Sequence, residues 1–254
     1  MPRGHCGRVV MVMELSIGLP DGLLMSACDG TELTLYEADH TTVRRRINCS
    51  VLEGARIADI VWSHKLSAVI AAVPDKNQLF RWDPYTDALQ EYGGTGEPGR
   101  RDGKIAQAKF AATVSITEAG DGKLWLVDKD SSALRYIAID TDRPDGDPHV
   151  VTVIGRHGAG YQDGPAADAK LARPEDLQIL YDGSVVVADT GNDAIRHLDP
   201  SAGEVFTIYG GPDQDGDDLD EDVVLQAPAR VTVADSHLWV EDANGRHLLE
   251  PRYV

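Results

Sequence analysis

Residues 163–200 have the sequence DGPAADAKLARPEDLQILYDGSVVVADTGNDAIRHLDP. This stretch is the best guide to the fold of the chain. It contains two β-like runs on either side of a DG turn at Asp182-Gly183, and it closes on Asp-Pro. Moved back by 61 positions without a gap, it aligns with DGKIAQAKFAATVSITEAGDGKLWLVDKDSSALRYIA, residues 102–138. Asp189, Ala194 and Arg196 then fall on Asp128, Ala133 and Arg135. An internal repeat of this length outweighs any single motif, because it sets the architecture.

Three further segments follow the same template of strand, turn, strand, Asp with a polar turn, strand, Asp-Pro and strand. No stretch shows the periodicity of an amphipathic helix. Four-stranded units that recur about every 50 residues predict an all-β protein, a β-propeller that occupies residues 1–254 as a single domain. We count five blades, with six as the alternative. The expected blade ranges are 14–48, 55–94, 108–155, 170–211 and 224–254.

The last unit lacks residues for a fourth strand, since only residues 252–254 follow Pro251. The apolar run at residues 8–13 precedes the first unit. We expect it either to complete the last blade and close the ring or to extend the first strand of the first unit.

Composition is that of a globular protein, with 42% hydrophobic residues among 254. No apolar run approaches the roughly 20 residues of a membrane helix. The apolar run Val9–Met13 ends at Glu14 and is too short for the core of a signal peptide. The three cysteines show no metal-ligand spacing and an odd count, so a reducing cytoplasm is the expected location.

The net charge of −18 is distributed unevenly. Residues up to Arg101 carry a net charge of −2, and residues from Asp102 onward carry −16. Such a surface repels nucleic acid and anionic membranes, so neither is an expected partner. Solubility explains the charge most simply. The alternative is attraction of a cationic small molecule or protein.

Residues 163–211 resemble an NHL repeat. The marks are the DG-plus-alanine lead-in, Pro174 before the inner strand, and the VADTGN-x-x-I-R core. Residues 102–155 resemble the repeat less closely, and the other units share only its pattern. The resemblance implies a propeller, usually of six blades. NHL propellers include protein-binding and RNA-binding modules, and related propellers include lyases, lactonases and strictosidine-synthase-like enzymes, among which fold analogy does not choose.

An aspartate recurs near the end of the second strand of the units. We expect a structural role, because a short carboxylate at a turn accepts backbone N–H hydrogen bonds. Arg135 and Arg196, on the third strand, are expected to pair with neighbouring carboxylates. The recurring aspartates are Asp29, Asp128, Asp189 and Asp242.

The starts of the innermost strands are expected to face the central channel of a propeller. Several carboxylates around one arginine would shift each other's pKa values, and could supply acid–base catalysis or hold a cation. A water-filled channel lined by paired charges is the favoured alternative. The candidate catalytic residues are Asp176, Arg230 and Asp59. The candidate ligand-binding residues are Glu14, Arg56, Ser115 and Glu175.

No cofactor or metal is predicted with a defined ligand set. In the acidic loop, Gly216 stands fourth from Asp213, whereas a calcium-binding EF-hand loop needs glycine sixth. The match therefore fails, and calcium at residues 213–222 is kept as an alternative to a solvated loop. The eight histidines are scattered and none begins an expected inner strand, which disfavours zinc.

Two functions follow from these observations. The first is a scaffold that binds a small molecule or a protein without changing it. The second is a small enzyme, a lyase, hydrolase or cyclase, that uses carboxylates and Arg230 at the channel mouth. We favour binding, because the sequence contains no nucleophile elbow, phosphate loop or metal set.

Overall fold

Short strands joined by tight turns make up the chain, as the alternating apolar residues and DG turns predict. The computed structural model describes residues 16–20, 22–28, 31–139, 146–212, 224–234 and 237–249. Within these ranges the helices are single 3-10 turns of three residues each. None of them has the length or the apolar content needed to cross a membrane.

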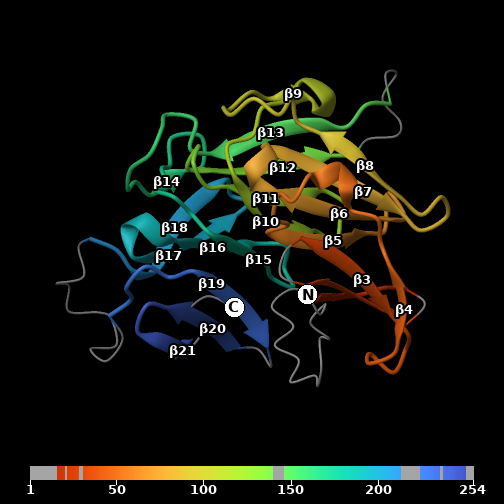
Figure 1. The fold of residues 1–254 in the computed structure, drawn as a ribbon. Helices are drawn as coiled ribbons and strands as arrows, with labels where there is room; N and C mark the ends of the chain where they lie inside the picture. The colour runs from red at the N-terminus through yellow and green to blue at the C-terminus, as the bar shows by residue number, and fades with distance from the viewer. Residues whose placement is uncertain are drawn as a thin grey trace.

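The strands form five antiparallel sheets, each a meander in chain order (Figure 1). The first sheet contains β1 (Ser16–Gly18), β2 (Leu24–Cys28), β3 (Glu32–Tyr36) and β4 (Val43–Arg46). The second contains β5 (Asp59–Ser63), β6 (Ala68–Val73), β7 (Gln78–Asp83) and β8 (Ala88–Gly93). The third contains β10 (Thr113–Glu118), β11 (Leu124–Asp128), β12 (Ala133–Ala138) and β13 (His149–Ile154). The fourth contains β15 (Asp176–Ile179), β16 (Val185–Asp189), β17 (Ala194–Asp199) and β18 (Glu204–Gly210). The fifth contains β19 (Arg230–Ala234), β20 (His237–Asp242) and β21 (Gly245–Leu249).

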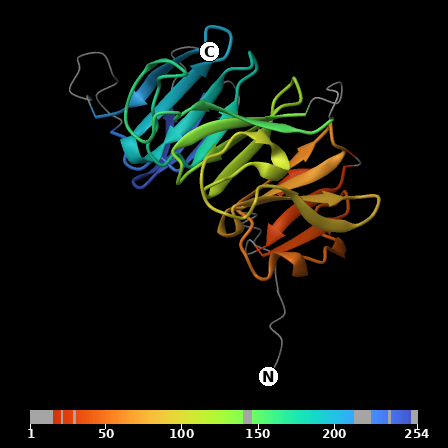
Figure 2. The same ribbon diagram turned by 90° about the horizontal axis from the view of Figure 1, so that it is seen from above.

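The first strands of the sheets, β1, β5, β10, β15 and β19, contact one another in succession. Figure 2 shows the sheets following one another in chain order from the orange first sheet to the blue last one. The fold is a five-bladed β-propeller, as the repeat predicts, and the six-bladed alternative is wrong for the described residues. The ring-closing role expected for residues 8–13 lies outside the described residues, as do residues 250–254.

The third and fourth sheets carry a fifth strand that the four-stranded template does not include. The DG lead-in forms β9 (Gly103–Lys104), which pairs with β13, and β14 (Gly164–Pro165), which pairs with β18. Each lead-in therefore becomes the outer edge of its own blade. The aspartate of the DG pair accounts for this position, as described below.

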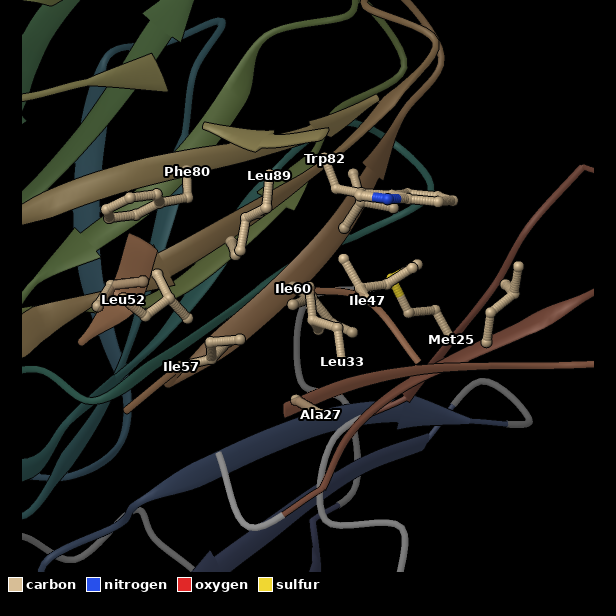
Figure 3. Packing of buried hydrophobic residues seen from close by; sticks show 14 residues of the cluster. Met25, Ala27, Leu33, Ile47, Leu52, Ile57, Ile60, Phe80, Trp82 and Leu89 are labelled. Atoms are coloured by element: carbon tan, nitrogen blue, oxygen red, sulfur yellow. The ribbon is translucent and has the colours of Figure 1, made fainter. Parts of the chain in front are cut away.

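Apolar residues fill the space between successive sheets, because alternate residues of each strand point to opposite faces. Figure 3 shows the cluster between the first two sheets, which includes Met25 and Leu33 of the first sheet and Phe80 and Trp82 of the second. The middle strands supply core residues to both neighbours. On β16, Val187 packs toward the third sheet and Val186 toward the fifth. All six residues of β6 are buried.

A wholly buried arginine ties the layers of the fourth blade together. Arg196 Nη1 donates to Asp189 Oδ2 at 2.7 Å and to the carbonyl of Lys170 at 2.9 Å. Its Nη2 donates to the carbonyl of Gln162 and to Asp163 of the lead-in. Asp163 in turn accepts the backbone N–H of Thr207 on β18 at 3.0 Å. The arginine thus fixes the lead-in as the outer strand.

Arg135 repeats this network in the third blade and confirms the predicted pairing of both arginines with carboxylates. Its guanidinium bonds Asp128 and Asp102, each at 2.9 Å. Asp102 accepts the backbone N–H of Thr152 at 2.8 Å. An aromatic ring lies beside each guanidinium, with Phe110 at 5.0 Å from Arg135 and Tyr161 at 4.9 Å from Arg196.

The structural role predicted for the strand-end aspartates is confirmed for the three that the structure describes. Asp128 Oδ1 accepts the N–H of Ala111, and Asp189 Oδ1 that of Ala172, both at 2.7 Å. These donors precede the inner strand of the same blade. Asp242 also holds its own turn through Asn244 and Gly245. Asp29 lies outside the described residues.

A second repeated contact positions each inner strand against the preceding blade. A residue one to three positions before the strand has a positive φ, and its N–H donates to the side chain that ends the 3-10 or polar turn of the previous blade. Because the contact recurs at equivalent positions, it sets the spacing of successive inner strands. The donor and acceptor pairs are Ala112 with Asn77 (3.2 Å), Arg173 with Ser132 (3.1 Å) and Ala227 with Asp193 (2.6 Å).

Candidate functional site

Four of the predicted channel residues stand at equivalent places on adjacent inner strands. Asp59, Asp176 and Arg230 are the first residues of β5, β15 and β19. Ser115 is the third residue of β10, directly after a shift in the register with β11. Glu14, the fifth predicted position, lies outside the described residues.

The two aspartates make the same pair of contacts. Asp59 Oδ1 accepts the N–H of Ile60, and its Oδ2 accepts the N–H of Ile116 in the next blade, both at 2.8 Å. Asp176 accepts the N–H of Leu177 and that of Val231 in the next blade, both at 2.9 Å. Each carboxylate therefore joins two blades.

Ser115 connects the two carboxyl groups. It is buried, and its Oγ donates to Asp176 Oδ1 at 2.8 Å. The Ser115 side chain also acts on Asp59 and lowers the pKa of that carboxyl. A polar chain of Asp59, Ser115 and Asp176 thus crosses three consecutive blades.

The raised pKa of Asp59 is the distinctive electrostatic feature of Asp59, Ser115 and Asp176. Burial raises the pKa of Asp59 to about 7, and the charge of Asp176 adds to the rise, whereas the N–H of Ile116 opposes it. Burial also raises the pKa of Asp176, where Val231, Ser115 and Arg230 act in the opposite direction. A carboxyl group that titrates near neutral pH is suited to exchange protons with a ligand.

The other predicted site residues, Glu175, Arg56 and Arg230, each have a different environment. Glu175 forms an ion pair with Lys129 of the third blade. Arg56 is exposed, and its backbone N–H donates to Asp75 at 3.2 Å. Arg230 is also exposed and acts electrostatically on Asp176. Their roles in binding stay predictions.

We expect the carboxyl carbon of Asp59 to titrate with a midpoint near pH 7 in carbon-13 NMR. The folded protein holds this proton more tightly than the unfolded chain does, so this group's contribution to stability falls as pH rises from about 4 to 7. Asp39 is the matched control. The hydroxyl of Thr42 and nearby N–H groups lower its pKa to about 2. A midpoint for Asp59 near pH 4 would contradict the expectation.

The structure also contains a cavity that sequence reasoning missed. It has a volume of about 910 Å³ and lies on the fourth blade, lined by the turn before β16 and by residues of β17 and β18. Pockets for small molecules have volumes of roughly 300–1,000 Å³. The repeat alignment holds a signal for it, since Trp125 and Tyr136 of the third blade become Val186 and His197 here. The lining includes Asp163, Asp182, Ser184, His197, Asp199 and Phe206.

Among the described residues, no group of three or more His, Cys, Asp or Glu side chains is placed to hold a metal ion. The calcium site kept as an alternative at residues 213–222 lies outside the described part of the chain. The structure therefore leaves that alternative as a prediction.

The solved structures that are similar to this chain support its propeller fold. No model of a known protein family matches the chain. Protein SUPPRESSOR OF QUENCHING 1, chloroplastic, of Arabidopsis thaliana is 33% identical over 154 residues, which cover 60% of this chain and 13% of that protein. An auxiliary nutrient binding protein from Bacteroides ovatus matches with a TM-score of 0.68 and 16% identity, over 92% of this chain and 58% of that one. Virginiamycin B lyase from Staphylococcus aureus matches with a TM-score of 0.58 and 14% identity, over 94% and 70%.

These similarities support conclusions about the fold and not about the activity. At such identities the two solved structures show the fold alone. The match also spans only a small part of the Arabidopsis protein, so the activity of that whole protein does not follow for this chain. Proteins of this architecture include both a binding protein and a lyase, and the choice between these classes depends on the residues described above.

Proposed function

We propose that this chain is an NHL-repeat-like propeller that binds a small molecule or a protein without transforming it. The observation that carries the proposal is the bonding of Asp59 and Asp176. Each carboxylate accepts one N–H from its own blade and one from the next. Both oxygens of each carboxylate therefore already accept a backbone N–H, and one of them joins the next blade, which favours a structural use of these carboxylates over catalysis.

The similar proteins support the same proposal. The Bacteroides ovatus protein is named for nutrient binding. The matched part of the Arabidopsis protein is 13% of its length, so there the similar segment belongs to a much longer chain, as interaction modules often do. We carry binding over to this chain as a proposal on these grounds.

The charge of the chain favours a cationic partner. The overall charge is −18, and most of it lies from Asp102 onward. An acidic surface raises the local concentration of cations and the rate at which they associate. We propose the cytoplasm as the location, because three cysteines are an odd count without metal-ligand spacing and do not suggest a disulfide framework.

Calorimetric titration with a panel of cationic, neutral and anionic small molecules and peptides tests the proposal. We expect saturable binding by cationic members, with heats that decrease as salt rises. Mass spectrometry of each bound member should show an unchanged molecule. Absence of binding across the panel would overturn the proposal, and chemical conversion of a bound member would replace it with catalysis.

Acid–base catalysis by the inner-strand carboxyls is the second candidate. The pKa of about 7 at Asp59 is the observation that favours it. In that case Asp59→Asn should abolish conversion of the substrate, while the far-ultraviolet circular dichroism of the variant shows the native fold. Conversion that persists in Asp59→Asn would remove this candidate.

A further inference from the structure

The third blade shows how this propeller holds an ammonium group of its own. Lys123 forms an ion pair with Asp121 at the DG turn, and its Nζ lies 5.4 Å from the centroid of the Tyr136 ring. Tyr136 packs against Trp125, with ring centroids 5.3 Å apart. A carboxylate and an aromatic face together therefore stabilise the cation.

The fourth blade keeps the same turn without the ammonium. Asp182 and Asp121 are equivalent, and each accepts the N–H two residues on, from Ser184 at 2.9 Å and from Lys123 at 3.0 Å. The alignment places Ser184 at the position of Lys123. It also places Val186 and His197 at the positions of Trp125 and Tyr136. Two of these three positions, Ser184 and His197, line the cavity of about 910 Å³.

The lining of this cavity is acidic and includes an aromatic ring. Phe206, on β18, is paired across the strands with His197, and its side chain is 48% exposed. Asp163 is already paired with Arg196. Asp182 and Asp199 accept hydrogen bonds from Ser184 and Ser201, which hold the pKa of each carboxyl below 3.8. Among the described residues, no Lys or Arg lines the cavity.

His197 forms part of the cavity wall and is not a cation. The residue is only 8% exposed, it lines the cavity, and its ring stacks on that of Phe206 with centroids 6.4 Å apart. Burial lowers the pKa of His197 from its ordinary value, so the ring does not replace the missing ammonium. Its Nε2 is buried within the protein and does not face the open volume.

We propose that the cavity on the fourth blade binds a small organic ammonium compound, whose cationic group takes the place that the ammonium of Lys123 occupies in the third blade. Asp182 and Asp199 provide the carboxylates, Phe206 provides the aromatic face, and the apolar part of the ligand fills the volume that Trp125 and Tyr136 fill in the third blade. This inference rests on the proposed binding function and names its ligand class.

The test uses phenethylammonium as the probe and phenethyl alcohol as its neutral control, titrated into the full chain and followed by amide NMR shifts. We expect saturable shifts at Ser184, His197 and Phe206 with the ammonium compound and none with the alcohol. Ser184→Lys restores the lysine of the third blade and should weaken binding at least tenfold, because its own ammonium occupies the site. Thr86→Lys, which adds the same charge at an exposed turn of the second blade, should leave the affinity within twofold.

Each outcome supports or overturns the inference. Equal binding of the alcohol, or Ser184→Lys binding as tightly as the unmodified chain, would overturn it. Shifts confined to the region of Asp59 and Asp176 would also overturn it and leave the proposed binding function standing. The wider panel of cationic, neutral and anionic partners decides that function separately, because it includes peptides too large for this cavity.

Discussion

Replacing Arg196 with methionine is expected to lower the free energy of unfolding by about 3–5 kcal/mol, the usual cost of breaking a buried ion pair by removing one partner. The guanidinium is wholly buried and bonds Asp189 and Asp163 together with the carbonyls of Lys170 and Gln162. Without it, the carboxylate of Asp189, which is also wholly buried, loses its countercharge. Urea unfolding monitored by tryptophan fluorescence measures the change.

Arg173→Met is the matched control for this variant. Arg173 pairs with Asp130 on the surface, where the two side chains are 61% and 51% exposed. We expect a loss below about 1 kcal/mol, because exposed ion pairs contribute little. The double variant Arg196→Met with Asp189→Leu should recover part of the loss, since it removes the orphaned charge as well. Equal stability of Arg196→Met and Arg173→Met would contradict the assigned role.

Replacing Gly210 with alanine is expected to cost roughly 3 kcal/mol, through a steric clash added to backbone strain. Gly210 ends β18 with a φ of +69°, a conformation that disfavours a side chain. A Cβ at this position would collide with the carbonyl oxygen of Asp193, directly before the neighbouring strand β17. The obstacle is backbone, so rotation of a side chain cannot relieve the clash.

Gly203→Ala is the control that has the backbone strain of a positive φ without the steric clash. Gly203 has a similar φ of +70°, and a Cβ there would meet nothing within 4 Å. We expect a loss of about 1 kcal/mol from the left-handed conformation alone. Thermal unfolding of both variants measures the difference, and a loss at Gly210 no larger than at Gly203 would show that the strands separate to accept the methyl group.

The architecture could be predicted because the repeat is local. The gapless match between residues 102–138 and 163–199 carries the strand pattern, the DG turns and the pairing of Arg135 and Arg196 with carboxylates. Each of these features depends on residues a few positions apart within one blade. A repeat that cannot bury its apolar faces alone must stack on its neighbours, and a ring of blades follows from that requirement.

The local repeat pattern does not predict the lead-in strands β9 and β14. It marks Asp102 and Asp163 as repeated residues, but it does not show that they place these strands at the outer edge of each blade. Their partners, Thr152 and Thr207, lie about 50 and 44 residues away on the last strand of the blade. A contact across that separation has no signature in a local sequence window.

By itself, the sequence determined the all-β class, the propeller and the placement of Asp59, Ser115, Asp176 and Arg230 at equivalent positions, because repetition alone specifies these. Only the tertiary structure decided what these residues do. It bonded one oxygen of each of two carboxylates to the next blade, and it raised the pKa of Asp59 through burial that no composition reveals. It also placed Ser184 and His197, two positions that differ from the aligned third repeat, in the wall of a cavity, because empty volume depends on how neighbouring strands pack and not on any one residue.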